Sequence, residues 1–412
     1  MKSNYKKIGD FIHLIDDRNA GLKIKTLLGL SISKQFIPSV ANIIGTDMEN
    51  YKIIRKNQFA CSTMQVRRDK KMPVALLQKL DEAIISQAYP VFAINDTNKL
   101  LPEYLMMWFS REEFDREACF YAIGGVRGSL EWDDFCDMTM QIPTHEKQKE
   151  IIKEYKVLLN HIALNNLLIQ KLEETVQAIY KQWFLDFEFP DENGKPYRSY
   201  GGEMEFIGEL EKEIPKGWTY GCLGDITEKI TDGTHSTVID DPLGKYHLLS
   251  CKNIKNGQIL ITESDRKINL ETLTFLRKRT DLSIHDILVT TVGTIGEVAQ
   301  ITTINIPYEL QRSVAILKAN NLLISHQYLY QFTKSKQFQN QAEFFSEGTA
   351  QKCLFLGSIN QIKILIPNKL IQNKFDKYSY SINKMIGIYQ NKLIATQKAC
   401  DILLAKMSLM DH

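Results

Sequence analysis

Two short runs of basic side chains are the residues of this chain with the most evident chemistry. They are Arg67-Arg68-Asp69-Lys70-Lys71 and Arg277-Lys278-Arg279. Arginine and lysine contact phosphate groups, so such runs are typical of nucleic-acid contacts, although a solvated surface loop explains either run equally well. The net charge of +2 over 412 residues neither excludes nor requires a nucleic-acid partner.

No established catalytic pattern accompanies these basic runs. The sequence has no Gly-x-x-x-x-Gly-Lys-Ser/Thr loop, no Gly-x-Gly-x-x-Gly, no Asn-Pro-Pro-Tyr-like segment and no His-Glu-x-x-His. Its 7 cysteines include no Cys-x-x-Cys pair, which is typical of reduced thiols in the cytoplasm. No run of about 18 apolar residues is present. We therefore expect a cytoplasmic protein without catalytic, metal-binding or cofactor-binding residues.

The elements that position the polar residues are written twice in the chain. Tyr104 and Tyr328 are separated by 328 − 104 = 224 positions. The same offset relates Phe120 to Phe344, Gly124 to Gly348, Pro143 to Pro367 and Gln148 to Gln372. Solenoid repeats are much shorter, about 20–50 residues, so this offset indicates two domains of one design.

The composition divides the chain into five segments. Residues 1–145 and 219–368 combine β-rich runs, loops and helical patches, which predicts an α+β protein with two mixed domains in tandem. Residues 146–187 and 369–412 are helical, and residues 188–218 are rich in turn formers and form a connector. Strands are expected at 286–292 and 362–366, and helices around Tyr104 and Tyr328.

The two helical segments carry apolar residues at alternating spacings of four and three. This heptad pattern extends over more than four heptads and predicts that the two helices pair as a coiled coil. An amphipathic helix that packs only on its own domain is the alternative, but it would not require heptad phase for so long. The predicted seam comprises Ile151, Tyr155, Leu158, Ile162, Asn165, Ile169, Leu172, Val176, Ile179, Trp183, Phe375, Ser379, Ile382, Ile386, Tyr389, Leu393, Thr396, Cys400, Leu403 and Met407.

Chain geometry favours antiparallel pairing of these helices. The first helix is roughly 55 Å long at about 1.5 Å per residue, and the connector leads directly from its end to the second domain. Parallel pairing would require the connector to run back along the whole helix. An antiparallel pair would relate the two domains by a pseudo-two-fold axis.

Several segments resemble the specificity subunit of type I restriction–modification systems. The segment Ala178 to Glu188 resembles the end of the central helical region of that family. Gly201 to Met204 and Ile214 to Trp218 resemble the approach to its second recognition domain. In the second domain, further matches are Leu223 to Asp225, Ile230 to His235, Asp286 to Gly296 and Glu309 to Ser313, and those in the first domain are Ile8 to Asp10 and Gly124 to Arg127. The family often has a glycine where His285 stands, so a different local turn is expected there.

The resemblance implies a non-catalytic subunit that recognises DNA. Each domain would contact one half of a bipartite, asymmetric target in double-stranded DNA, and the coiled coil would set the length of the unread spacer. Two methyltransferase subunits would dock on the chain, and restriction subunits would join them. S-adenosylmethionine, Mg and ATP would bind those partner subunits, and neither a cofactor nor a membrane would bind this chain.

Within this resemblance, loop residues that are polar or basic become candidate DNA contacts. Those in the first domain are Gln65, Arg67, Arg68 and Arg127. Those in the second are Thr234, His235, Arg312, Thr349 and Lys352. A solvent-exposed loop side chain without a partner is the alternative for each of them.

Three other functions stay open on the sequence. A coiled-coil scaffold that joins protein partners would explain the helices and the repeat without DNA. A solitary nuclease or a methyltransferase fragment would need catalytic motifs that the sequence lacks. A silent, recombination-exchanged variant of the specificity subunit has the same sequence features as an active one.

Overall fold

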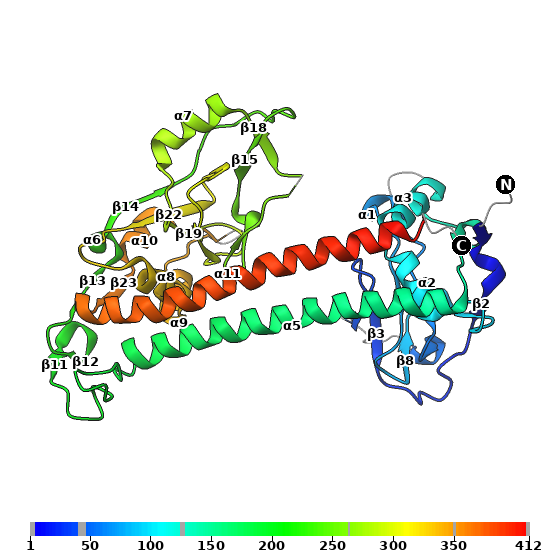
Figure 1. Cartoon of the computed structure of the whole chain (residues 1–412), viewed down its shortest axis with the longest axis horizontal. Helices are drawn as coiled ribbons and strands as arrows, with labels where there is room; N and C mark the ends of the chain where they lie inside the picture. The colour runs from blue at the N-terminus through cyan, green and yellow to red at the C-terminus, as the bar shows by residue number, and fades with distance from the viewer. Residues whose placement is uncertain (1–4, 40–46, 124–127, 263, 349–351, 409–412) are drawn as a thin grey trace. The chain divides into compact units, whose positions relative to one another are not determined.

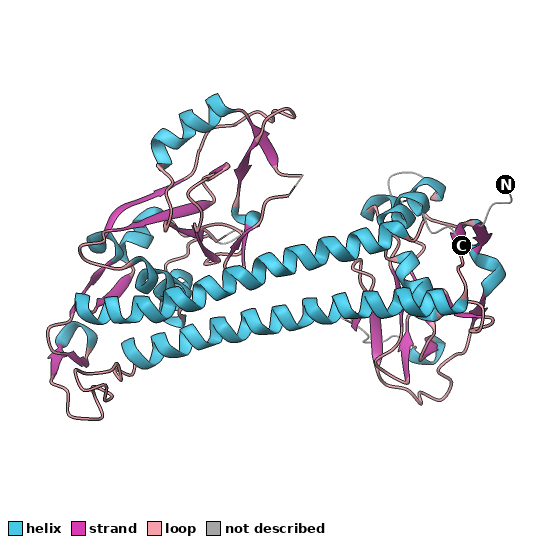
Figure 2. Ribbon diagram, viewed as in Figure 1, coloured by secondary structure: helices cyan, strands magenta, loops and turns pink. Residues whose placement is uncertain are grey.

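The computed structural model describes residues 5–39, 47–123, 128–262, 264–348 and 352–408. The chain forms two compact units, unit 1 with Met1–Asn166 and Gln390–His412, and unit 2 with Leu167–Tyr389. Each unit combines strands with helices (Figure 2), as the mixed class predicts. Among the described residues, no helix is long and apolar enough to cross a membrane.

Unit 1 contains two four-stranded sheets, with strand orders β2-β9-β6-β7 and β4-β3-β8-β5, and the strand pair β1-β10. Its strands are β1 Tyr5–Lys7, β2 Ile12–Ile15, β3 Leu27–Leu30, β4 Phe36–Pro38, β5 Lys52–Arg55, β6 Phe59–Cys61, β7 Val74–Leu76, β8 Glu82–Ile85, β9 Val91–Ile94 and β10 Thr139–Gln141. Its helices are α1 Val66–Asp69, α2 Pro102–Phe109, α3 Glu112–Tyr121, α4 Trp132–Asp137 and the first part of α5 His145–Phe184.

Unit 2 contains a four-stranded sheet ordered β14-β22-β19-β20, a three-stranded sheet ordered β18-β15-β21, and the pairs β11-β12, β13-β23 and β16-β17. Its strands are β11 Met204–Ile207, β12 Lys212–Pro215, β13 Thr219–Cys222, β14 Thr227–Asp232, β15 Tyr246–Leu249, β16 Ile254–Lys255, β17 Gln258–Ile259, β18 Arg266–Ile268, β19 Ile287–Thr290, β20 Val298–Gln300, β21 Tyr308–Leu310, β22 Val314–Ala319 and β23 Lys363–Ile366. Its helices are α6 Leu223–Ile226, α7 Leu270–Thr280, α8 His326–Lys334, α9 Lys336–Phe344, α10 Leu356–Gln361 and the first part of α11 Lys369–Lys406 (Figure 1).

The two units repeat one topology. The order β2-β9-β6-β7 in unit 1 corresponds to β14-β22-β19-β20 in unit 2, and all the pairings in both sheets are antiparallel. The smaller sheets also correspond, because β3 pairs in parallel with β8 just as β15 pairs in parallel with β21. Helices α2, α3 and α4 lie 224 positions before α8, α9 and α10. The repeat in the sequence is therefore a repeat of structure.

A buried glutamine holds the start of each long helix in the same way. The Gln148 amide donates to the Lys99 carbonyl at 2.8 Å and to the Pro143 carbonyl at 3.0 Å, and it accepts from Leu101 N–H at 2.8 Å. Gln372 makes the three equivalent bonds, each shifted by 224 positions, with Leu323 at 3.0 Å, Pro367 at 2.7 Å and Ser325 at 2.7 Å. Both side chains are 0% exposed, so every one of these bonds is shielded from water.

The seam positions that the heptad pattern predicts are protected from solvent. All 10 in α5, the nine in α11 and Met407 directly after α11 are buried or half-buried, including the polar Asn165, Ser379 and Thr396. Within unit 1, Ile151 and Ile152 at the start of α5 share a core with Leu404 and Met407 near the end of α11. Within unit 2, the end of α5 packs on the start of α11, and the Trp183 and Phe375 ring centroids lie 5.9 Å apart. The pairing inside each unit is therefore antiparallel.

The element boundaries differ in detail from those predicted. Helix α5 starts at His145 and ends at Phe184, three residues before the predicted end, and Phe187 then adopts a left-handed φ of 64°. The connector is not only a succession of turns, because β11 and β12 form an antiparallel hairpin there. The expected helix around Tyr104 is two helices, α2 and α3.

Loss of one of these two buried glutamine side chains, which we call a glutamine clamp, should lower the stability of the unit that contains it. We expect Gln372→Ala to lower the free energy of unfolding of unit 2 by about 2 to 4 kcal/mol, because two buried carbonyl groups and one N–H group lose their partner. Urea unfolding, monitored by hydrogen exchange in unit 2, measures the decrease in the free energy of unfolding. Gln397→Ala, at an exposed position of α11, is the matched control and should leave the unfolding midpoint unchanged. An equal midpoint for both variants would contradict the clamp.

His285 occupies a turn that favours glycine. Its φ is 76°, so the turn adopts a left-handed backbone conformation although the residue carries a side chain. The ring lies over His326 at the start of α8, with centroids 4.8 Å apart. Burial, the neighbouring His285 and Lys369 lower the pKa of His326 to about 4 from an ordinary 6.5, and its Nδ1 atom is buried without a hydrogen-bond partner.

This lowered pKa predicts a loss of stability in acid. The unfolded chain protonates His326 near pH 6.5, whereas the folded chain resists protonation down to about pH 4, so stability falls as the pH drops through that window. We expect His326→Gln to flatten the dependence of the unfolding midpoint on pH between 6.5 and 4. Thermal unfolding at half-unit pH steps measures it, and an unchanged slope in the variant would refute this assignment.

Candidate nucleic-acid interface

Strand ends that lie far apart in the sequence meet along one edge of unit 2. Thr234 N–H donates to the Leu310 carbonyl at 2.8 Å, and Arg312 N–H donates to the Thr234 carbonyl at 3.0 Å. Gly233 is needed for this approach, because a Cβ atom there would lie 2.0 Å from the Leu310 carbonyl oxygen. The Gln311 N–H also donates to the Leu249 carbonyl at 2.8 Å. The segments after β14, β15 and β21 are therefore joined by backbone hydrogen bonds.

A fourth segment extends this edge. Thr291 N–H donates to the Ser313 carbonyl at 3.0 Å, and Leu354 N–H donates to the Thr291 carbonyl at 2.9 Å. Of the candidate contacts predicted for the second domain, the structure thus places Thr234, His235, Arg312 and Lys352 on segments joined by backbone hydrogen bonds. The side chains of the last three are exposed. The remaining candidate, Thr349, lies outside the described residues.

His235 is oriented by a carboxylate that is nearly buried. Its Nε2 atom lies 2.7 Å from Asp232 Oδ2, and Arg279 from α7 hydrogen-bonds to Oδ1 of the same carboxylate. The Asp232 side chain is only 9% exposed, whereas those of His235 and Arg279 are 53% and 51% exposed. Asp232 therefore fixes two side chains that both reach solvent beside Thr234.

A polar cleft of about 510 Å³ opens beside the same edge. It is lined by Asp240, Pro242, Leu248, Ser250, Lys252, Ser264, Asp265, Arg266, Lys267 and Gln311. Although burial of the Asp265 carboxyl opposes ionisation, Lys252 at 2.8 Å and hydrogen bonds from Asn253 and Thr262 hold its pKa well below the usual range. The Lys252 ammonium is thus tied to the cleft wall while its side chain stays 61% exposed.

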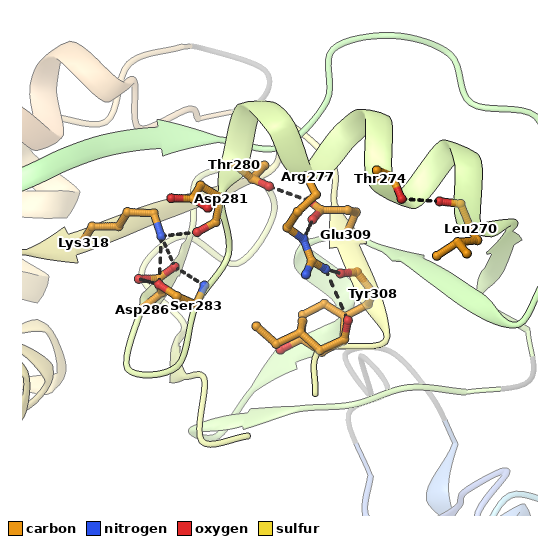
Figure 3. Close-up of polar contacts among 11 residues, drawn as sticks. Leu270, Thr274, Arg277, Thr280, Asp281, Ser283, Asp286, Tyr308, Glu309 and Lys318 are labelled. Carbon is orange, nitrogen blue, oxygen red and sulfur yellow. Dashed lines mark hydrogen bonds and ion pairs between the residues drawn. The ribbon is translucent and has the colours of Figure 1, made fainter. Parts of the chain in front are cut away.

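Two buried ion pairs hold α7 against the sheets (Figure 3). Arg277 pairs with Glu309, whose side chain is 0% exposed, and donates to the Tyr308 carbonyl at 2.7 Å. Thr280 donates to the same carboxylate at 2.9 Å, and burial nevertheless raises the pKa of Glu309. Lys318 lies 2.6 Å from Asp286, directly before β19.

These ion pairs correct one interpretation of the sequence. The run Arg277-Lys278-Arg279 is neither a solvated loop nor a set of three phosphate contacts, because it forms the last turn of α7. Arg277 points inward to Glu309, and Arg279 supports Asp232. Of the three, only Lys278 has an exposed side chain for which the structure shows no ion pair among the described residues.

Three of the four candidates of the first domain lie on one short helix or directly before it. Gln65 precedes α1 with a left-handed φ of 64°, and Arg67 and Arg68 lie within α1 rather than in a loop. Arg68 Nε is 2.7 Å from Asp69, so the charge of that guanidinium is partly neutralised. Gly128 packs against Arg67, since a Cβ atom on Gly128 would lie 2.6 Å from the Arg67 Cβ. Arg127 lies outside the described residues.

Sequence reasoning missed Lys252, Arg266, Lys267 and Gln311 as members of the interface. Only Gln311 had a signal, as part of the family-like segment Glu309 to Ser313. Lys252 lies on the turn after β15, whereas Arg266 and Lys267 are consecutive on β18, so folding brings Lys252 to these two residues. Within the described residues, no group of three or more His, Cys, Asp or Glu side chains could hold a metal ion.

Comparison with known proteins finds similar proteins of one kind. Residues 215–392 match the family model described as the type I restriction modification DNA specificity domain. The type I restriction enzyme MjaIX specificity subunit of Methanocaldococcus jannaschii is 22% identical over 310 residues, which cover 75% of this chain and 68% of that protein. The HindI specificity subunit of Haemophilus influenzae is 22% identical over 364 residues, which cover 76% of each chain.

A solved structure shares the fold. The S subunit of a type I restriction–modification system from M. genitalium superposes with a TM-score of 0.54 at 15% identity, over 99% of this chain and 96% of that chain. The matches in sequence thus make the chain similar to the specificity subunits of type I restriction–modification systems, and the superposition shows that it shares the fold of one of them. Members of this family recognise DNA and are not catalytic, in agreement with the sequence analysis.

The cleft predicts a change in the salt dependence of DNA binding. We expect Arg266→Gln to weaken binding about equally on all duplex sequences and to reduce the slope of log K against log[salt] by about 0.9, the value for one phosphate contact. Fluorescence anisotropy on specific and random duplexes between 50 and 200 mM salt measures both effects. Lys336→Gln, at an exposed position of α9, is the control and should keep the full slope. An unchanged slope for Arg266→Gln would remove the cleft from the interface.

Proposed function

We propose that this chain reads a bipartite, asymmetric target in double-stranded DNA, with one domain for each half-site. The observation that carries this proposal is the edge of unit 2. There, His235, Arg312 and Lys352 lie on hydrogen-bonded segments beside a polar cleft lined by basic side chains. Polar and cationic side chains on adjoining strand ends can reach base edges and phosphates together.

Some side chains of this interface would contact bases, and others would contact phosphates. Gln311 lines the cleft and is half-exposed, and a glutamine amide matches the N6 and N7 atoms of adenine. Lys252 and Arg266 suit phosphate contacts, which supply affinity without sequence information. In the first domain, the sequence predicts Gln65, Arg67, Arg68 and Arg127 as the contacts. Because the two sets of side chains differ, the two half-sites should differ as well.

We also propose that the long helices act as a coiled coil that sets the spacer between the half-sites and carries two methyltransferase subunits. The heptad seam and its burial in both units support this role. Restriction subunits would complete the complex, and S-adenosylmethionine, Mg and ATP would bind the partner subunits. The methyl transfer and the cleavage therefore need no residue of this chain.

An exchange of domains tests the modular reading. We expect replacement of residues 1–145 by the corresponding domain of another specificity subunit to change one half-site and to leave the other half-site unchanged. Selection of bound duplexes from a random library by the complex with methyltransferase subunits identifies both half-sites. A change in both half-sites would contradict the proposal that each domain reads one half-site. A chain that binds protein partners independently of salt and is not retained on DNA would instead favour a scaffold.

An insertion tests the spacer role of the helices. Four residues inserted into the first long helix should change the preferred spacer before they change either half-site, because the domains keep their own DNA-facing edges. The same selection measures both quantities. A lost half-site with an unchanged spacer would contradict the proposal that the helices set the distance.

A further inference from the structure

Between residues 102 and 144 and their counterparts 224 positions later, one described side chain is the same in both units and yet exposed. Between residues 102 and 144, the other identical pairs with described side chains are Tyr104 and Tyr328, Leu105 and Leu329, Phe114 and Phe338, Ala118 and Ala342, Leu130 and Leu354, Ile142 and Ile366, and Pro143 and Pro367. All of these are buried or half-buried, so packing explains why they match. Phe120 and Phe344 are 79% and 82% exposed, and packing does not explain them.

The surroundings of this phenylalanine are also repeated in shape. Phe120 meets Tyr121 with ring centroids 5.4 Å apart at an interplanar angle of 80°. Phe344 meets Phe345 with centroids 5.3 Å apart at 77°. Each unit therefore presents one edge-to-face aromatic pair at the C-terminal end of two corresponding helices, α3 in unit 1 and α9 in unit 2. A single exposed apolar side chain is ordinary, but a matched pair in two otherwise divergent copies needs a cause.

Other exposed positions on the same two helices have diverged. Glu112 in α3 corresponds to Lys336 in α9, so the charge is reversed, and Arg116 corresponds to Asn340. All four of these side chains are exposed. Sequence drift has therefore changed the surface around the aromatic pair but has kept the phenylalanine.

A feature that is the same in both units suits a partner that is the same at both. Base contacts should differ between the units if the half-sites differ, as proposed above. A phosphate contact would be the same at both units, but an aromatic ring offers neither an N–H donor nor a cation for it. A carboxylate also lies close in sequence to each phenylalanine, Glu117 before Phe120 and Glu343 beside Phe344, and Glu343 pairs with Lys352 at 3.9 Å. Aromatic side chains are, by contrast, enriched in protein interfaces.

We propose that these two aromatic pairs, Phe120 with Tyr121 and Phe344 with Phe345, are equivalent docking surfaces for two copies of one protein partner. Resting on the proposed function, the partner is the methyltransferase subunit, with one copy on each unit. Each phenylalanine ring would insert into an apolar pocket of that subunit. This contact lies on the recognition domain itself and is separate from the helix seam.

The test uses the full chain and the methyltransferase subunit of the same restriction–modification system. Native mass spectrometry and titration compare the wild type with Phe120→Ser, Phe344→Ser and the double variant. We expect each single change to weaken one of the two binding events at least about tenfold, and the double change to weaken both. Phe344→Tyr keeps a flat aromatic ring and should bind nearly as the wild type does.

Leu322→Ser is the matched control, because Leu322 is apolar and 87% exposed but is not repeated, its counterpart being Asn98. It should retain both methyltransferase copies, and all variants should retain the DNA affinity of the isolated chain. A double variant that binds two copies with wild-type affinity would overturn the proposal, as would lost DNA affinity with docking preserved. A wild-type chain that binds neither the subunit nor DNA would instead refute the proposed function on which it rests.

Discussion

The fold depends on the buried glutamine that closes each domain onto its own long helix. Gln148 and Gln372 each satisfy two carbonyl groups and one N–H group at the point where a strand, a helix start and a loop converge. An unpaired amide at a fully buried position would be strongly unfavourable, so the three segments must meet in one geometry. That geometry fixes the direction in which each long helix leaves its domain. The start of one long helix can then pack its seam against the end of the other long helix within the same unit.

The two units satisfy the same constraint with different side chains. In unit 2 the end of α5 contributes Tyr180, Trp183 and Phe184, which form an aromatic cluster with Tyr328 and Phe375. In unit 1 the equivalent positions at the end of α11 are Leu404, Met407 and Ser408. Arg111 there hydrogen-bonds to Ser408 and lies over the Trp108 ring at 3.9 Å. Backbone geometry is thus shared between the units, while packing chemistry is not. This freedom allows the surfaces of the two domains to diverge, as the proposed reading of two different half-sites would require.

Sequence alone predicted the features that depend on periodicity. The offset of 224 and the heptad seam are properties of spacing, and the same backbone bonds and burial follow in both units. The candidate interface was harder to predict from the sequence, because Lys252, Arg266 and Gln311 come from separate strand ends that only the sheet brings together. The role of Arg277 was hidden for another reason, since its partner Glu309 lies 32 residues away and is buried. At His285 the sequence predicted a different turn because glycine is absent, but the backbone still adopts the left-handed conformation that favours glycine.

The central claim is that two unlike domains of one chain read two half-sites across an unread spacer. Co-expression with the methyltransferase subunit of the same restriction–modification system, followed by single-molecule sequencing of modified adenines across a genome, tests it most directly. The account predicts one methylated motif with two different specified halves separated by a fixed number of unspecified base pairs. A continuous motif, two identical halves, or no methylation by a complex shown to be assembled would contradict it.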